Sequence, residues 1–470
     1  MKKIQELIKI NRKSITHKIN VDNNQIKENM LLLRDLLKGK WNYQGFVVSD
    51  WGSIGEMIPH GYAKNNKEAA EKAMLAGTDM DMESRAYMAE LPKLVEEGKI
   101  DVQLINDAAR RILTKKIEMG LFDDPYRFSN EKRQKKQLNN LESRKFGREF
   151  GSKSIVLLKN QKNILPLSKT TKTIAIIGPF AKETTANHGF WSVAFKDDDQ
   201  RIIKQFDGIK NQLDKNSTLL YAKGANVDDQ DKSMFAEAVE TAKKADVVIL
   251  TLGEGHAMSG EAKSRSNLHF SGVQEDLLKE IAKTGKPIIL MINTGRPLVF
   301  DWAADHIPTI LYTWWLGTEA GNSIADVLFG TINPGGKLPM TFPRTEGQIP
   351  IYYNHYNTGR PAKNLTDRNY VSAYIDLDND PKYPFGFGLS YTLPVLAAVL
   401  GMAAQTPANG WVNNWGERWD EKRQSEGTLV ILENPEAHLH PQGQTAMGRL
   451  LALAAASGVQ ILVETHSDHL

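Results

Sequence analysis

The stretch DVVILTLG at Asp246–Gly253 decides the fold class of this chain. Its nearly unbroken apolar run is typical of a strand that is buried on both faces of a sheet. Three further segments have the same character: TIAIIG at Thr173–Gly178, PIILMIN at Pro287–Asn293 and TILYTWW at Thr309–Trp315. Amphipathic helices are predicted between them, notably over Ser233–Ala245 and Gly272–Thr284. This alternation predicts an α/β fold with a mostly parallel sheet covered on both faces.

A second α/β region precedes that sheet in the sequence. LLLRDLLKGKW, from Leu31, predicts an amphipathic helix, and GFVVSD, ending at Asp50, predicts a short strand. A helix over Lys67–Ala76, a strand over Thr78–Met82 and a helix over Asp101–Met119 are expected to follow. Strand, helix, strand and helix form a βαβα unit, and two such units cannot close a barrel by themselves.

Composition excludes several classes of function. The chain has 470 residues and a formal net charge of +3, which is too small to indicate nucleic acid or an anionic membrane as a partner. It has no cysteine, which excludes disulfides and thiolate sites. The longest apolar run, Leu393–Ala404, is too short to span a bilayer, and MKKIQELIKINRK lacks the apolar core of a signal peptide. We therefore expect no membrane partner and, as the sequence is written, a cytoplasmic location. The oligomeric state is not predicted.

Two carboxylates stand where α/β proteins place catalytic groups. Asp50 follows a predicted strand directly, although an aspartate there also commonly caps the next helix. Glu261 lies in GEGHAMSGEAKSR, a glycine-rich loop that follows DVVILTLG. Gly255 and Gly260 have the spacing of a phosphate-binding loop, but the next position holds a carboxylate where that motif needs lysine. Glu254 competes with Glu261, and composition alone does not separate the two.

An ordered set of motifs adds a family resemblance. The motifs are GFVVSDWG, AGTDMDM, MGLFDDPY, SIVLLKN, IAIIGP, YAKGA, GEAKSR, WWLGTEAGNSIADVLFGTINPGGKLPMTFP, YYNHYNTGRP and YPFGFGLSYT. In this order, from about Leu31 to Thr392, they resemble glycoside hydrolase family 3, and especially its bacterial periplasmic β-glucosidases. The resemblance implies a (β/α)8 barrel followed by an α/β sandwich domain. It also implies hydrolysis of terminal β-D-glucosyl residues through a covalent glycosyl-enzyme, with an oligosaccharide or an aryl or alkyl β-glucoside as substrate, no cofactor and no metal. Members of the family are usually periplasmic or secreted.

The resemblance gives roles to particular residues. It implies that Asp50 is the nucleophile and that Glu261 is the general acid/base. Trp51 and Trp191 match tryptophans that sandwich the sugar in some members, and aromatic faces suit the apolar faces of a pyranose. The alternative for either tryptophan is a packed position at an interface. Arg265 is expected to anchor the acid/base loop.

The chain also departs from the family pattern. A complete barrel needs eight strand–helix units and ~250 residues, whereas about 45 residues precede the nucleophile strand here. We therefore expect only the last two units of the barrel, without the family's glucose-binding residues from earlier strands. The predicted organisation is an unassigned basic segment at 1–30, the barrel part at 31–120, a linker at 121–144, the sandwich domain at 145–392 and a tail at 393–470.

The tail resembles the end of an ABC/AAA-type ATPase and is expected to form a small α/β unit. Glu433, in TLVILENPE, matches a Mg²⁺-holding carboxylate, Glu436 is at best a substitute base, and His466 matches a histidine near the γ-phosphate. The phosphate-binding loop is absent from the sequence, so we expect no nucleotide binding by the tail alone. GFGLSYT, ending at Thr392, fits both resemblances and suggests a junction. The rival hypothesis is therefore an inactive, truncated or chimeric fragment with an intact sandwich domain.

Overall fold

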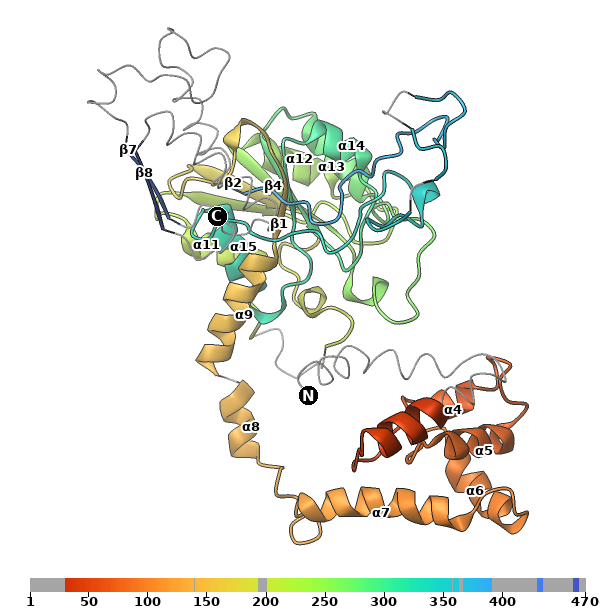
Figure 1. Ribbon diagram of the computed structural model, residues 1–470. Coiled ribbons are helices and arrows are strands. Elements are labelled where there is room, and N and C mark those ends of the chain that lie inside the picture. The colour runs from red at the N-terminus through yellow and green to blue at the C-terminus, as the bar shows by residue number, and fades with distance from the viewer. Residues whose placement is uncertain are drawn as a thin grey trace. The chain divides into compact units, whose positions relative to one another are not determined.

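The computed structural model describes residues 30–138, 140–192, 201–356, 358–362, 367–390, 429–433 and 460–464. They fall into two compact units that divide between Leu138 and Asn139, inside the segment expected to be a linker. Figure 1 shows the elements of both units.

A six-stranded sheet of order β1-β6-β5-β4-β2-β3 forms the centre of the second unit. Its strands are β1 (Val156–Asn160), β2 (Thr173–Ile177), β3 (Thr218–Ala222), β4 (Val247–Gly253), β5 (Ile288–Asn293) and β6 (Thr309–Tyr312). All neighbours are parallel except β1, which pairs antiparallel with β6. The expected α/β class with a mostly parallel sheet is confirmed.

Helices cover both faces of this sheet, as Figure 1 shows. They are α9 (Leu141–Ser154), α11 (Gln205–Gln212), α12 (Phe235–Lys243), α13 (Gln274–Ala282), α14 (Asp301–His306) and α15 (Ala320–Leu328). The short helices are η2 (Gln161–Asn163), η3 (Thr185–His188), η4 (His256–Met258), η5 (Gly317–Glu319) and η6 (Glu346–Gln348). In β4, Val248 and Leu250 point into the core under α12, α13 and α14, while Ile249 points into the core under α11 and α15. Alternating side chains thus fill two apolar layers.

Two details of the sheet differ from the sequence prediction. The strand expected to reach Trp315 ends at Tyr312, because Trp314 adopts a left-handed backbone with φ of 56° that no strand accommodates. The edge strands β1 and β3 were not predicted. Most of β3 is only partly buried, so its residues lack the continuous apolar character of the central strands.

The first unit is mainly helical. It contains the π-helix η1 (Leu31–Lys40) and the helices α4 (Ser53–Glu56), α5 (Asn66–Ala76), α6 (Ala86–Glu96), α7 (Val102–Glu118) and α8 (Glu131–Leu138). Helix α8 lies in the stretch expected to be linker, and none of its residues is buried. Side chains of α4, α5 and α6 form the unit's apolar core, which includes Ile54, Met74 and Leu94.

The strands expected at 45–50 and 78–82 are reduced to one parallel bridge between Val48 and Met80. Main-chain bonds from Ser49 N to Met80 O (2.9 Å) and from Asp79 N to Val47 O (2.8 Å) join the two segments. Within the described residues, each segment has only the other as a strand neighbour. A parallel ladder that is bonded on one side alone stays short, which accounts for the difference.

In the tail, the described residues form β7 (Leu429–Glu433) and β8 (Gln460–Glu464), which pair in parallel. Glu433 is the last residue of β7. Glu436 and His466 lie outside the described residues.

Candidate active site

The parallel strands reverse their spatial order between β2 and β4. From β2 the chain proceeds to β3 on one side, and it then returns to β4, β5 and β6 on the other. In open α/β sheets, ligands bind outside the carboxyl ends of the strands at such a reversal. The loops that leave these ends are 178–192 after β2 and 254–269 after β4. The first carries Trp191, and the second carries Glu254, Glu261 and Arg265.

The structure separates the two competing glutamates. Glu254 is fully buried directly after β4, and its carboxylate accepts hydrogen bonds from Arg265 Nη1 (2.5 Å), Thr294 Oγ1 (2.5 Å) and Arg296 Nε (3.1 Å). Glu261 is exposed. Among the residues that the structure describes, Glu261 makes no side-chain hydrogen bond or ion pair. Glu254 is therefore occupied by internal contacts, whereas the Glu261 carboxylate is available to a ligand.

The loops that carry Trp191 and Glu261 touch each other. Trp191 is 76% exposed and meets the ring of Phe190 edge-on, with the ring centroids 5.3 Å apart. Phe190 in turn lies on Gly260, where a Cβ atom would come within 2.3 Å of Phe190 Cγ. The contact between Phe190 and Gly260 is therefore flanked by the exposed indole of Trp191 and the exposed carboxylate of Glu261.

Arg265 closes the β4 loop on itself. Its Nη1 donates to Glu254 Oε1 at the start of the loop, and its Nη2 donates to the carbonyl of His269 (3.2 Å) at the end. It makes no recorded contact with Glu261 within the described part of the chain. Arg265 therefore connects the two ends of the loop.

In the first unit, Asp50 is exposed immediately after the bridge at Val48. Its Oδ1 accepts from the backbone N of Trp51 (2.7 Å). The alternative role as a helix cap is wrong, because Gly52 is the N-cap of α4 and the Asp50 side chain does not bond that helix. Trp51 is 68% exposed. The first unit thus presents an exposed carboxylate beside an exposed indole.

Asp79, which follows Thr78 in the neighbouring segment, is instead buried and ion-paired. Lys38 Nζ lies 2.7 Å from its carboxylate and Arg111 Nη1 lies 2.9 Å away. Its Oδ2 also accepts from the backbone N of Val47 (2.8 Å), on the segment that leads to Asp50. Asp79 therefore fixes the local chain path and is not open to a ligand.

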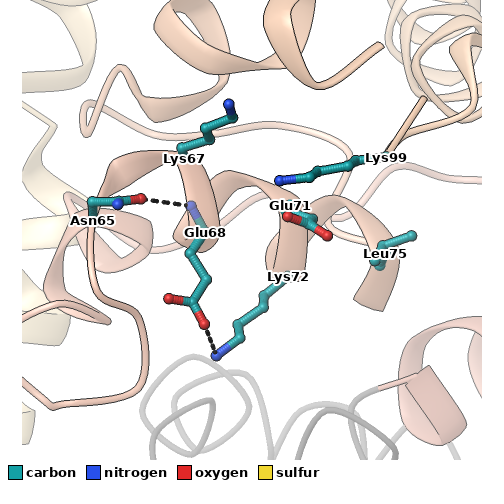
Figure 2. Close-up of a pocket in the computed structure, with 7 residues that line it drawn as sticks. All are labelled: Asn65, Lys67, Glu68, Glu71, Lys72, Leu75 and Lys99. Atoms are coloured by element: carbon teal, nitrogen blue, oxygen red, sulfur yellow. Dashed lines mark hydrogen bonds and ion pairs between the residues drawn. The ribbon is translucent and has the colours of Figure 1, made fainter. Parts of the chain in front are cut away.

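A hollow of about 420 Å³ in the first unit is not this site. It is lined by Asn65, Lys67, Glu68, Glu71, Lys72, Leu75 and Lys99. Figure 2 shows Lys72 paired with Glu68. Lys67 and Lys99 both pair with Glu97, which lies outside the lining. These lysines are neutralised by neighbouring carboxylates, and none of the expected site residues lines the hollow.

Two classes of site are absent from the described residues. Their histidine, aspartate and glutamate side chains form no group of three that could hold a metal ion. None of their helices is both long and apolar enough to cross a membrane.

Most of the chain matches known protein-family models. The model of the glycosyl hydrolase family 3 C-terminal domain matches residues 155–391, and the N-terminal domain model of the same family matches residues 13–115. The chain belongs to glycosyl hydrolase family 3. The N-terminal match begins inside the basic segment that sequence analysis left unassigned. A model described as an AAA ATPase domain matches residues 386–470.

Relatives of this family member include enzymes of two specificities. The chain is 42% identical over 384 residues to a protein of Salmonella typhimurium named periplasmic beta-glucosidase, and it is 37% identical over 380 residues to a beta-xylosidase of Formosa agariphila. These alignments cover 77% of this chain and 50% and 51% of the relatives. The structure is similar to a crystal structure of beta-glucosidase from Listeria innocua with isofagomine (TM-score 0.71, 38% identity, 77% of this chain and 50% of that one). The chain thus spans about half the length of the relatives it matches.

Sequence reasoning missed Thr294, Arg296 and Phe190. Thr294 and Arg296 follow the end of β5, and β5 pairs with β4. A prediction that these two strands are neighbours would have placed the segment after β5 next to the Glu261 loop. Phe190 precedes Trp191 in GFWS and gave no separate signal.

Proposed function

We propose that this chain provides the catalytic carboxylates of a retaining β-glucosidase-type glycoside hydrolase. Asp50 is the nucleophile and Glu261 is the general acid/base. Trp51 and Trp191 flank the sugar, and Arg265 anchors the acid/base loop. Family membership and relatives named as beta-glucosidases support this proposal. The observation that carries it is the position of Glu261, an exposed carboxylate on the loop after β4, where the strand order reverses.

The reaction proceeds by two displacements. The Asp50 carboxylate attacks the anomeric carbon and forms a glycosyl ester, while the Glu261 carboxyl group protonates the departing glycosidic oxygen. Water then attacks the anomeric carbon while Glu261 takes up its proton, the bond from that carbon to the Asp50 carboxylate breaks, and the sugar leaves with net retention. This route requires carboxyl groups ~5–5.5 Å apart.

Turnover of 4-nitrophenyl β-D-glucoside tests the proposal. We expect Asp50→Ala to abolish turnover and Glu261→Ala to reduce it by ~10²–10⁴. Azide separates the two roles. It should restore turnover in Glu261→Ala as β-glucosyl azide, because it attacks the α-linked glycosyl-enzyme. Any rescue of Asp50→Ala should instead give the α-azide. Equal turnover by the parent and by Asp50→Ala would contradict the assignment of Asp50 as the nucleophile.

The substrate is proposed at the level of an oligosaccharide or an aryl or alkyl β-glucoside. A relative named beta-xylosidase makes 4-nitrophenyl β-D-xyloside the matched comparison. For the compartment, the relative named periplasmic favours the periplasm or secretion over the cytoplasmic location expected from the sequence as written. Fractionation of cells that express the native gene tests this point.

A second candidate is a catalytically inactive fragment with an intact sandwich domain. The single bridge between Val48 and Met80, in place of two regular strands, favours it. A folded second unit that gives no product above the Asp50→Ala background would support it.

A third candidate is a nucleotide-linked role for the tail, with Glu433, Glu436 and His466 as its functional groups. The AAA ATPase domain match at 386–470 and the parallel pair β7 and β8 favour it. Against it stands the sequence, which lacks a phosphate-binding loop. Titration with Mg-ATP tests it, and absence of binding would eliminate it.

A further inference from the structure

One arginine holds the Glu261 loop from both sides. The Nη2 atom of Arg296 donates to the carbonyl of Met258, before Glu261, and to the carbonyl of Lys263 (2.7 Å), after it. The loop between these carbonyls is exposed over 260–264 and includes Ala262 with φ of 57°. Such a segment buries little apolar surface of its own. Its path therefore depends on polar contacts with the rest of the unit.

The guanidinium of Arg296 is in turn held by the buried Glu254. Arg296 Nε donates to Glu254 Oε2 (3.1 Å), which also accepts from Thr294 Oγ1. The backbone N of Glu254 donates to Asn293 O (2.8 Å), so the carboxylate is fixed to the ends of β4 and β5. Tyr312 Oη donates to the carbonyl of Arg296 (2.5 Å) from the adjacent β6. The rigid sheet therefore determines where the Arg296 side chain lies.

We propose that Glu254 and Arg296 form a positioning pair that sets the conformation of the loop carrying Glu261. Neither residue is proposed to touch substrate. Glu254 orients the guanidinium, and Arg296 connects the carbonyls on either side of the acid/base. The consequence for catalysis rests on the proposed function, whereas the consequence for the conformation of the loop does not.

The first test needs no turnover. Amide hydrogen exchange of the full chain reports on Met258 and Lys263, whose backbone N atoms donate to Gly255 O (2.9 Å) and Gly260 O (3.3 Å). Arg296→Lys keeps a charge but cannot serve Glu254 and two carbonyls with one planar fork. We expect exchange at both amides to rise at least about tenfold, with β4 and β5 unchanged.

Two further variants control this measurement. Glu254→Gln should have the same effect as Arg296→Lys, because it removes the charge that orients the guanidinium. Arg344→Lys removes an arginine contact to the carbonyl of Asp380 (2.9 Å) elsewhere in the unit and should leave the loop unchanged. If amide exchange in β4 also rises in Glu254→Gln, the test of the proposal rests on Arg296→Lys alone. Parent-like loop exchange in Arg296→Lys, with β4 and β5 intact, would overturn the proposal.

The second test separates positioning from general destabilisation. Phenyl β-D-glucoside needs protonation of its leaving group, whereas 2,4-dinitrophenyl β-D-glucoside does not. A misplaced acid should lower kcat/KM for phenyl glucoside by about 10- to 100-fold and change that for the dinitrophenyl substrate by less than about threefold. An equal loss on both substrates would refute the positioning role. A parent without turnover would instead refute the proposed function and leave the exchange result to decide the role of the pair.

Discussion

Replacing Asp79 with asparagine should open the segment that leads to Asp50. The Asp79 side chain is 4% exposed and lies against Lys38, which is 9% exposed, and Arg111. Asparagine keeps an acceptor for the backbone N of Val47 but leaves both cations without their partner. Removing one member of a buried pair costs about 3–5 kcal/mol, because the remaining charge stays buried and uncompensated. Since 1.4 kcal/mol is a factor of ten, the opening equilibrium should shift by about two to four orders of magnitude.

Amide exchange at Ser49, Asp79 and Met80 measures that opening, because their N–H groups form the bonds between the two segments. Asp81→Asn is the matched control. Asp81 lies close in the same segment, and its carboxylate accepts from Ser84 Oγ and from the backbone N of Tyr87. Asparagine can accept the bond from Tyr87 through its oxygen and can donate to the Ser84 hydroxyl through its amide nitrogen. We expect a change of about 1 kcal/mol or less in the control. Exchange in Asp79→Asn within about threefold of the parent would refute the reasoning from a buried pair.

Three further predictions concern pH, packing and a second ion pair. Burial lowers the pKa of Lys38, while Asp79 opposes that shift. The unfolded chain thus binds more protons, so the stability of the first unit should rise as the pH increases toward 10.5, the ordinary pKa of lysine. The unfolding free energy is measured by urea denaturation at several pH values. A Lys38→Met variant whose stability depends on pH as the parent's does would contradict this prediction. Gly260→Ala forces a Cβ atom against Phe190 and should cost about 1–3 kcal/mol, with faster exchange in both loops as the readout. Arg148→Met should lower the free energy of unfolding by up to about 3–5 kcal/mol, because it leaves the Asp326 carboxylate, which is 4% exposed, buried without its cation. Asp326→Asn should cost less, and a larger loss for Asp326→Asn in urea unfolding would contradict this prediction.

The central sheet could be predicted because its strands are buried on both faces. The four predicted strands correspond to β2, β4, β5 and β6, since apolar residues predominate on both of their faces. The edge strand β3 carries mixed burial and gave a weak signal. Trp314 ended β6 early through its backbone conformation, which depends on tertiary contacts such as its indole N–H bond to Ser154 O (3.0 Å).

The site could be predicted only in part. The position of Glu261 after an apolar strand indicated a functional loop, but composition could not exclude Glu254. The distinction depends on burial by Thr294, Arg265 and Arg296, and two of these residues lie on the segment after β5. Contacts between loops that are distant in sequence leave no periodic pattern, so Phe190 and Arg296 stayed unrecognised.

The antiparallel edge strand β1 makes the second unit a transferable module. Helix α9, whose N-cap Asn140 accepts from Glu142 N (2.9 Å), joins β1 to the preceding chain, and Arg148 on this helix binds Asp326 on α15. The strand shields the open edge of β6, which would otherwise invite pairing between molecules. A recombination event that preserves residues from Asn140 onward would therefore move a self-contained sheet between proteins. One that cuts after β1, beyond Asn160, would leave the edge of β6 unpaired and deliver an aggregation-prone sheet instead.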